Sequence, residues 1–427
     1  MTPIVPNTQL SLLTFASWTK RIAKRPFTCS MLLAVLFALT LSLPAQAQSF
    51  QMLYEFPLRK TGNTPSALLG VNGNLYGTTA FGGMSNEGTV FQLTGQGKLT
   101  SLYSFSRNDG RNPTIGPLIR DRAGNLYGTT QNGGDLHCVA FTNTSGCGTV
   151  FKISAGGKET ILHSFSGGPD GSYPLAGLVA DSAGNLYGTT ELGGIGCNGQ
   201  GCGTVYKITP AGTETVLYSF TGGADGSNPG SVVLVIDSAG NLYGTAGAGG
   251  DLTCGSQGLG CGVVFKIDPT GKETVLHAFT GGADGSNPST GVVRDSSGNL
   301  YGTLPIGGTC RNCGLVFKID PAGNETVLYN FTQEEVQPVL SASQLLLDPA
   351  GNLYGTTLYG GSLSDGTVFE VSNQGVYTML HSFNGSDGEF PVSGLIRDNA
   401  GNLYGTTSQG GADSCSLGCG LVFKITP

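Results

Sequence analysis

Cysteine is the residue whose spacing in this chain points most directly to chemistry. Ten of the eleven cysteines form five local pairs in comparable loops: Cys138 with Cys147, Cys197 with Cys202, Cys254 with Cys261, Cys310 with Cys313, and Cys415 with Cys419. Two further copies of that loop lack both cysteines, and presence or absence in pairs is the pattern that disulfides require. An exported chain can form them. We therefore predict five disulfides, with zinc as the lesser alternative because most pairs have no histidine beside them.

Polar side chains in the same loops are candidates for binding. His137 lies beside Cys138, with Asp135 and Phe141 near it. A loop histidine of this kind is either simply solvated or part of a binding site, and the sequence leaves both readings open. The binding candidates on these loops are Asp135, His137, Phe141, Asp251, Arg311 and Asp413.

A repeated series of aspartates could hold a metal. It recurs as Asp-Gly-x-x-Pro at Asp109, Asp170, Asp225, Asp284 and Asp387. A ring of carboxylates could bind Ca²⁺, which takes several oxygen ligands. Asp-Gly is also turn chemistry, and turn formation is the interpretation that we favour. No other metal, no cofactor and no catalytic residue is predicted, because no Ser–His–Asp, Cys–His or metal–histidine cluster stands apart from the repeat.

The elements that position these residues belong to a sevenfold repeat. The string Gly-Asn-Leu-Tyr-Gly begins at Gly73, Gly124, Gly184, Gly240, Gly298, Gly351 and Gly401. A period near fifty residues is typical of repeat architectures. In the third copy, residues 175–180, 186–190, 204–208 and 215–220 have the composition of four short strands, named A to D, joined by tight turns. Four antiparallel strands per repeat describe a blade of a β-propeller.

The two ends of the repeated region predict a closed ring. The last copy stops after strand C at 421–425, whereas residues 51–56 match strand D with no A, B or C before them. This N-terminal strand should complete the last blade and remove an open sheet edge. We predict an all-β fold, a single seven-bladed propeller over residues 48–427. His163, His277 and His381 replace a tyrosine of strand D and are predicted to be packing residues.

One face of the predicted ring varies. The B–C loops contain 4, 13, 8, 11, 5, 4 and 8 residues between the Gly-Gly pair and the glycine of strand C, while the A–B turns are nearly constant. Variable loops on a rigid scaffold favour recognition. Neutral drift of surface loops is an equally good explanation.

The first 47 residues predict export. Lys20, Arg21, Lys24 and Arg25 precede an apolar stretch over 31–43, and Ala45-Gln46-Ala47 resembles a signal-peptidase site. An uncleaved anchor is the lesser alternative. Removing these four cations changes the net charge from −7 to −11, which argues against nucleic-acid or anionic-membrane partners. We expect a monomer that is secreted, periplasmic or at the cell surface, with no membrane span after cleavage.

The repeat resembles a known family. The pattern of residues 121–134 followed by Gly-Thr-Val-Phe-Lys-Ile at 148–153, with a second clear copy at 181–194, is similar to the bacterial GloVer tandem repeat over essentially the whole mature chain. That resemblance implies an exported bacterial protein of a group whose C-terminal anchors vary. The chain departs from this pattern by reaching Pro427 without an anchor segment. Weaker, partial similarity to kelch and NHL-type propellers supports the fold only.

The resemblance implies no activity, so function rests on the repeat itself. We expect a non-enzymatic binding or scaffold propeller that uses the B–C loop face for a glycan or protein ligand. The alternative is an extracytoplasmic hydrolase or lyase acting on polysaccharide at the mouth of the central channel.

Overall fold

A computed structural model describes residues 48–57, 62–113, 116–138, 146–197, 201–230, 233–254, 258–310, 313–332, 344–411 and 419–426. By their internal contacts Met1–Ala47 and Gln48–Pro427 are separate units, and the described strands all belong to the second. Within the described ranges no helix is both long and apolar enough to cross a membrane.

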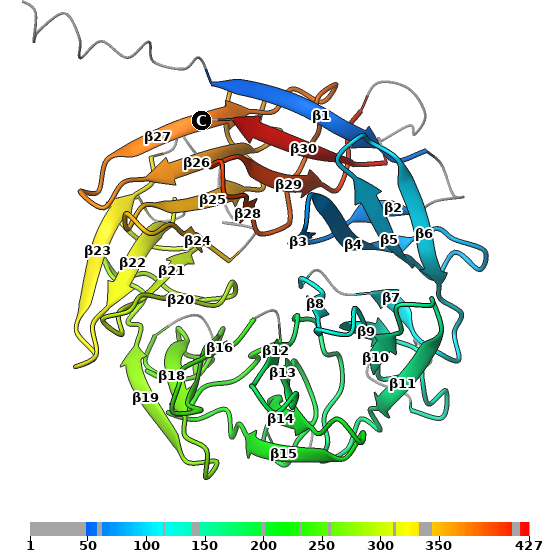
Figure 1. Ribbon diagram of the computed structural model, residues 1–427. Coiled ribbons are helices and arrows are strands. Elements are labelled where there is room, and N and C mark those ends of the chain that lie inside the picture. Colours follow the sequence, from blue (N-terminus) through cyan, green and yellow to red (C-terminus); the bar gives the residue numbers. More distant parts are fainter. Residues whose placement is uncertain are drawn as a thin grey trace, which may run out of the picture. The chain divides into compact units, whose positions relative to one another are not determined.

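Seven antiparallel sheets, called blades 1 to 7, follow one another around a ring (Figure 1). In the order of strands A, B, C and D, blade 1 contains β3 (Leu69–Val71), β4 (Asn74–Phe81), β5 (Thr89–Thr94) and β6 (Leu99–Ser104), and blade 2 contains β8 (Ile119–Arg120), β9 (Leu126–Asn132), β10 (Thr149–Ile153) and β11 (Glu159–Ser164). Blade 3 contains β12 (Val179–Ala180), β13 (Leu186–Thr190), β14 (Thr204–Ile208) and β15 (Glu214–Ser219), blade 4 contains β16 (Val235–Ile236), β17 (Leu242–Ala246), β18 (Val263–Ile267) and β19 (Glu273–Ala278), and blade 5 contains β20 (Val293–Arg294), β21 (Leu300–Leu304), β22 (Leu315–Ile319) and β23 (Glu325–Asn330). Blade 6 contains β24 (Leu346–Leu347), β25 (Leu353–Thr357), β26 (Thr367–Val371) and β27 (Tyr377–Ser382), and blade 7 contains β28 (Ile396–Arg397), β29 (Leu403–Thr407), β30 (Leu421–Thr426) and β1 (Ser49–Glu55). Two short strands, β2 (Asn63–Pro65) and β7 (Arg111–Pro113), pair with β4 and β9. The predicted seven-bladed propeller is confirmed.

The turn between strands A and B explains the Gly-Asn-Leu-Tyr-Gly motif. In blade 4 the Asp237 carboxylate accepts hydrogen bonds from the Asn241 backbone N–H (2.9 Å), the Asn241 side chain (2.9 Å) and the Tyr243 hydroxyl (3.0 Å). Gly240 has φ 83°, a left-handed conformation that a side chain would strain. The same three bonds surround Asp121, Asp181, Asp295, Asp348 and Asp398.

Each blade buries its apolar side chains against the next blade. Strand C is covered on both faces, since four of the five residues of β14 are buried. The second glycine of the motif makes room for it: a Cβ on Gly244 would lie 2.7 Å from Cζ of Phe265. One edge-to-face aromatic pair crosses every interface, with centroids 5.0–5.3 Å apart: Phe56–Phe91, Phe105–Phe151, Phe165–Tyr206, Phe220–Phe265, Phe279–Phe317, Phe331–Phe369 and Phe383–Phe423. Such pairs contribute about 0.5–1.5 kcal/mol each beyond area burial.

The N-terminal strand closes the ring. β1 pairs antiparallel with β30 from Ser49 opposite Thr426 to Glu55 opposite Leu421, and Figure 1 shows the blue β1 beside the red β30. The Phe56 N–H continues the join by donating to the Gly420 carbonyl at 3.0 Å. The predicted completion of the last blade by the first strand is therefore confirmed.

Strands A and D differ from the prediction in detail. In blade 3 only Val179 and Ala180 pair with strand B, and the preceding Gly177 lies so near Gly116 of blade 2 that a Cβ on Gly116 would overlap the Gly177 backbone. Strand D of blade 3 covers Glu214–Ser219 rather than 215–220, and it is half-buried because strand D is the outermost strand of each blade (Figure 1).

Candidate functional site

The B–C and D–A loops contact one another and form a single face, called here the loop face. The Gly194 N–H of the blade 3 B–C loop donates to the Gly168 carbonyl of the blade 2 D–A loop at 3.0 Å. The same bond joins Gly250 to Gly223 at 3.0 Å. Each of these D–A loops thus lies beside the B–C loop of the next blade, so neighbouring loops are held at fixed positions.

Disulfides brace these loops. Among the described residues four of the predicted pairs are disulfides, with Cα atoms 5.5–5.8 Å apart: Cys138–Cys147, Cys197–Cys202, Cys254–Cys261 and Cys310–Cys313. Cys419 is also disulfide-bonded, and its predicted partner Cys415 lies outside the described residues. Sulfur atoms joined in this way offer no thiolate to zinc, so the zinc alternative is wrong for the four pairs.

Sequence reasoning missed a glycine that accompanies each of three disulfides. Gly167, Gly222 and Gly281 lie in the D–A loop of the same blade with φ between 78° and 80°, and a Cβ on any of them would clash with the disulfide sulfurs. In blade 1, which has no cysteines, Arg107 occupies the position of this glycine, directly after Ser106. Its Nε lies 3.3 Å from Oε1 of Glu87, and Arg111 Nε lies 2.7 Å from Oε2. An ion pair therefore joins the two loops of blade 1. The co-occurrence of Gly-Gly and cysteine was the available sequence signal.

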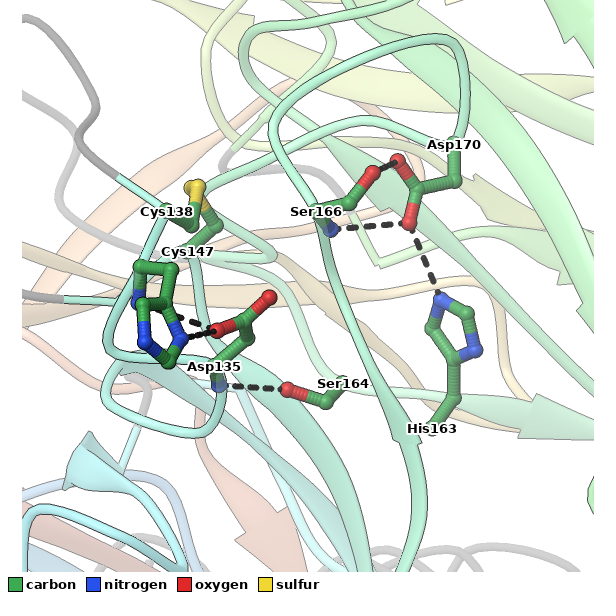
Figure 2. The surroundings of a disulfide bond; sticks show 8 residues. Asp135, Cys138, Cys147, His163, Ser164, Ser166 and Asp170 are labelled. Carbon is green, nitrogen blue, oxygen red and sulfur yellow. Dashed lines mark hydrogen bonds and ion pairs between the residues drawn. A yellow bond between two sulfur atoms is a disulfide. The ribbon is translucent and has the colours of Figure 1, made fainter.

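Asp135 and His137 lie together, as the sequence suggested. Asp135 Oδ1 accepts the His137 backbone N–H at 2.9 Å and lies 3.1 Å from the ring Nδ1. The Asp135 N–H donates to Ser164 Oγ at 2.7 Å, which fixes the loop to strand D (Figure 2). The backbone bond from His137 is the main cause of a lowered pKa at Asp135. The imidazole is fully exposed. Phe141 lies outside the described residues.

Asp251 occupies the corresponding position in blade 4 and caps its own loop. Its carboxylate accepts the Thr253 hydroxyl at 2.7 Å and the Thr253 N–H at 2.9 Å, and these bonds lower the pKa of Asp251. Asp135 lies in blade 2 and Asp251 in blade 4, and each carboxylate is bonded within its own loop. The remaining candidates, Arg311 and Asp413, lie outside the described residues.

The Asp-Gly series caps the D–A loops. Asp284 accepts the Thr280 N–H at 2.9 Å and the Thr280 hydroxyl at 2.7 Å, which is the turn-forming arrangement. The other four series members each accept the backbone N–H of the equivalent loop residue: Asp109, Asp170, Asp225 and Asp387. A single calcium site would need several of these carboxylates at one point. The structure places one on each loop.

Each strand D histidine faces the aspartate of its own loop. The distances from Nε2 to the carboxylate are 3.3 Å for His163, 3.8 Å for His277 and 3.1 Å for His381. The three rings also pack edge-on against phenylalanines, with centroids 4.7–4.8 Å apart. Burial raises the pKa of Asp170, but hydrogen bonds from His163 and Ser166 outweigh it and leave that pKa lowered (Figure 2).

Exposed apolar side chains recur on the loop face, a feature that sequence reasoning missed. Directly after the Gly-Gly pair, Met84 is 92% exposed and Ile195 is 78% exposed, and Leu363, which follows Ser362 in its loop, is 61% exposed. The neighbouring members of this set are Phe81, Leu136, Leu252, Leu259 and Tyr359, each more than a third exposed. Large apolar residues after a Gly-Gly turn were the sequence signal.

Comparison with known families settles the relationship of the chain. The Gloeobacter/Verrucomicrobia repeat matches residues 34–137, 135–345 and 252–427. The chain belongs to this family. Membership of the Gloeobacter/Verrucomicrobia repeat family confirms the resemblance to the GloVer repeat. A search of curated proteins gives no match.

Solved structures add no argument about this family member. A luciferin-regenerating enzyme is 13% identical with a TM-score of 0.43, over 89% of this chain and 96% of that chain. A gluconolactonase from Xanthomonas campestris is 14% identical with a TM-score of 0.41, over 73% and 87%. Scores this low support no transfer, so the architecture rests on the sheet order.

Proposed function

We propose that this Gloeobacter/Verrucomicrobia repeat protein is a non-enzymatic binding propeller that recognises a protein ligand outside the cytoplasm. The single observation behind the proposal is the set of exposed apolar side chains on the loop face, led by Met84, Ile195 and Leu363. Large apolar side chains that are exposed on several loops of one face are a feature of interaction sites.

The loops that carry these side chains are already ordered. Disulfides, the Glu87–Arg107 ion pair and backbone bonds between loops hold them before a ligand arrives. Pre-organised contact residues lose less conformational entropy on binding. The exposed ends of these aliphatic side chains favour an apolar patch on a protein over a glycan, because a glycan presents mainly hydroxyl groups. The disulfides are typical of a chain outside the cytoplasm.

The test is a combined variant, Met84→Ser with Ile195→Ser and Leu363→Ser, screened on arrays of peptides from exported host proteins and on glycan arrays. We expect peptide binding by the wild type and at least tenfold weaker binding by the variant. The matched control is Met52→Ser with Val376→Ser and Met379→Ser, three exposed apolar residues of β1, β27 and the turn before β27, away from the loop face. The control should bind as the wild type does.

Four outcomes contradict the proposal. Absence of any array binding argues against a recognition face, and equal losses in both variants argue against the loop face in particular. Polysaccharide turnover that disappears on changing His137 or Asp251 supports the enzymatic alternative instead. Binding to glycans but not to peptides would mean that the ligand is a glycan and not a protein.

A further inference from the structure

Neighbouring blades meet at their outer strands through a repeated trio of polar residues, and each such meeting of two blades is called a seam here. The trio contains the tyrosine or histidine of strand D, the aspartate of the following D–A loop, and the first residue of strand D in the next blade. Four of these seams end in glutamate: Tyr103–Asp109–Glu159, His163–Asp170–Glu214, Tyr218–Asp225–Glu273 and His277–Asp284–Glu325.

In two of these seams a tyrosine hydroxyl occupies the space between the acids. Tyr103 donates to Asp109 at 2.6 Å and Tyr218 donates to Asp225 at 2.9 Å. The hydroxyl is itself a hydrogen-bond donor, so it compensates one carboxylate without any added ion. In the seam from blade 6 to blade 7, Phe50 replaces the glutamate and stacks on His381 with centroids 4.0 Å apart.

The seam between blades 4 and 5 is different. His277 Nε2 lies 3.8 Å from Asp284, beyond hydrogen-bond distance and farther than in the other histidine seams. His277 Nε2 and Glu325 Oε1 are both buried without a hydrogen-bond partner, as are His163 Nε2 and Glu214 Oε1 in the other histidine–glutamate seam, so the distances between the three side chains are what set this seam apart. Leaving buried polar atoms without a partner is unfavourable. Among the described residues, His277, Asp284 and Glu325 form the group whose ligand atoms all lie within 4.8 Å of one another.

We propose that His277, Asp284 and Glu325 bind a divalent first-row transition metal, with Zn²⁺ as the reference ion. One imidazole nitrogen and two carboxylate oxygens are a donor set that such ions accept, and a fourth position stays open to water. Binding at the ~2.0–2.2 Å that Zn²⁺ requires would draw these three atoms closer to one another. The ion would join strand D of blade 4 to strand D of blade 5.

The state of the histidine suits a metal. Burial lowers the pKa of His277, which keeps the ring neutral, as a ligand must be. The Gly323 backbone forms a hydrogen bond with the same ring, an orienting contact of the kind that metal-bound histidines use. Imidazole nitrogen is a poor ligand for Ca²⁺, which prefers oxygen. The proposal therefore concerns zinc-like ions and does not depend on the ligand of the loop face.

The experiment is a calorimetric titration of the purified, exported protein with ZnCl₂ after chelator treatment and dialysis. We expect one equivalent to bind at this seam and to raise the midpoint of thermal unfolding. His277→Tyr reproduces the tyrosine seam that the chain already uses at Tyr218, so the variant should fold and lose the site, with affinity at least tenfold lower. Glu325→Gln should have the same effect on binding.

Matched variants separate this site from other zinc ligands. Glu273→Gln in the tyrosine seam and His137→Asn on the exposed loop should both leave the affinity within twofold. The proposal is overturned if no Zn²⁺ binds below millimolar concentration, or if His277→Tyr keeps the full equivalent. It is also overturned if CaCl₂ binds as tightly and His277→Tyr leaves that binding unchanged.

Discussion

The pKa values of carboxyl groups in this propeller are shifted in opposite directions according to where the groups lie. Hydrogen bonds hold the pKa of Asp237 below its usual range, although burial alone would raise it. At the seams burial dominates: together with the nearby Asp225 it raises the pKa of Glu273 to about 7. Glu159 and Glu325 are raised to about 7 for the same reasons. These glutamates bind protons more tightly in the folded than in the unfolded chain.

Glu273→Gln should flatten the pH dependence of stability. Because the pKa of Glu273 is raised on folding, its stabilising contribution is complete below about pH 4.5 and is lost as the pH rises through about 7. Urea unfolding of the wild type should therefore show falling stability from pH 5 to 8, and the variant a smaller fall.

Asp268→Asn is the control for this measurement. Hydrogen bonds from Thr270 and Lys272 lower the pKa of Asp268, so it titrates below the measured range and the slope should not change. An identical slope in wild type and Glu273→Gln would show that the seam glutamate does not titrate on folding.

At the scale of the element, the B–C loops are fixed to the D–A loops by interchangeable means. Blade 4 uses Cys254–Cys261 against Gly281, whereas blade 1 uses Glu87 against Arg107. Both arrangements tie a loop of variable length to a constant one, which explains how insertions are tolerated on one face of the ring.

Replacing Cys254 and Cys261 together by alanine should destabilise the protein by about 2–3 kcal/mol, the chain-entropy value for so short a loop. The effect should be local. Hydrogen exchange should accelerate at the Gly281 N–H, which donates to the Gly285 carbonyl, and stay unchanged at the Gly110 N–H of blade 1.

Glu87→Gln is the matched variant for the Cys254/Cys261 replacement. It weakens the ion pairs of blade 1, so the pattern of exchange should reverse. Unchanged exchange at Gly281 in the cysteine variant would mean that the disulfide does not hold the D–A loop.

At the scale of the whole molecule, the closing interface has the same construction as the six others. Phe56 from the N-terminal segment is fully buried and meets Phe91 edge-to-face at 5.3 Å, as Phe220 meets Phe265 at 5.1 Å. The ring is therefore continuous across the join between β1 and β30.

Phe56→Ala should cost about 3–5 kcal/mol, the usual loss for a buried phenylalanine. Phe220→Ala, at the equivalent position within the ring, should cost a similar amount in urea unfolding. Met52→Ala, on β1 but 37% exposed, should change stability by less than 1 kcal/mol. A negligible loss for Phe56→Ala beside a large loss for Phe220→Ala would contradict equal closure.

Much of the fold could be predicted because the repeat carries its own local instructions. Strands B and C of blade 3 match their predicted bounds at 186–190 and 204–208, since β-forming side chains lie between glycine turns. The candidate site was less accessible. Asp135 and His137 are close in sequence and could be placed together. The trio of His277, Asp284 and Glu325 could not, because Glu325 lies on another blade, and the distance between blades depends on packing.

The sequence by itself determined that the chain is a seven-bladed ring closed by its first strand and that cysteines pair within four of the B–C loops, because repeats, turn residues and cysteine spacing act locally. Only the tertiary structure decided which side chains of neighbouring blades lie close to one another. Packing brought Glu325 to His277, kept Asp135 and Asp251 on separate loops, and left Met84, Ile195 and Leu363 exposed on one face. Contacts between repeats depend on side-chain volume and burial, which no single repeat encodes.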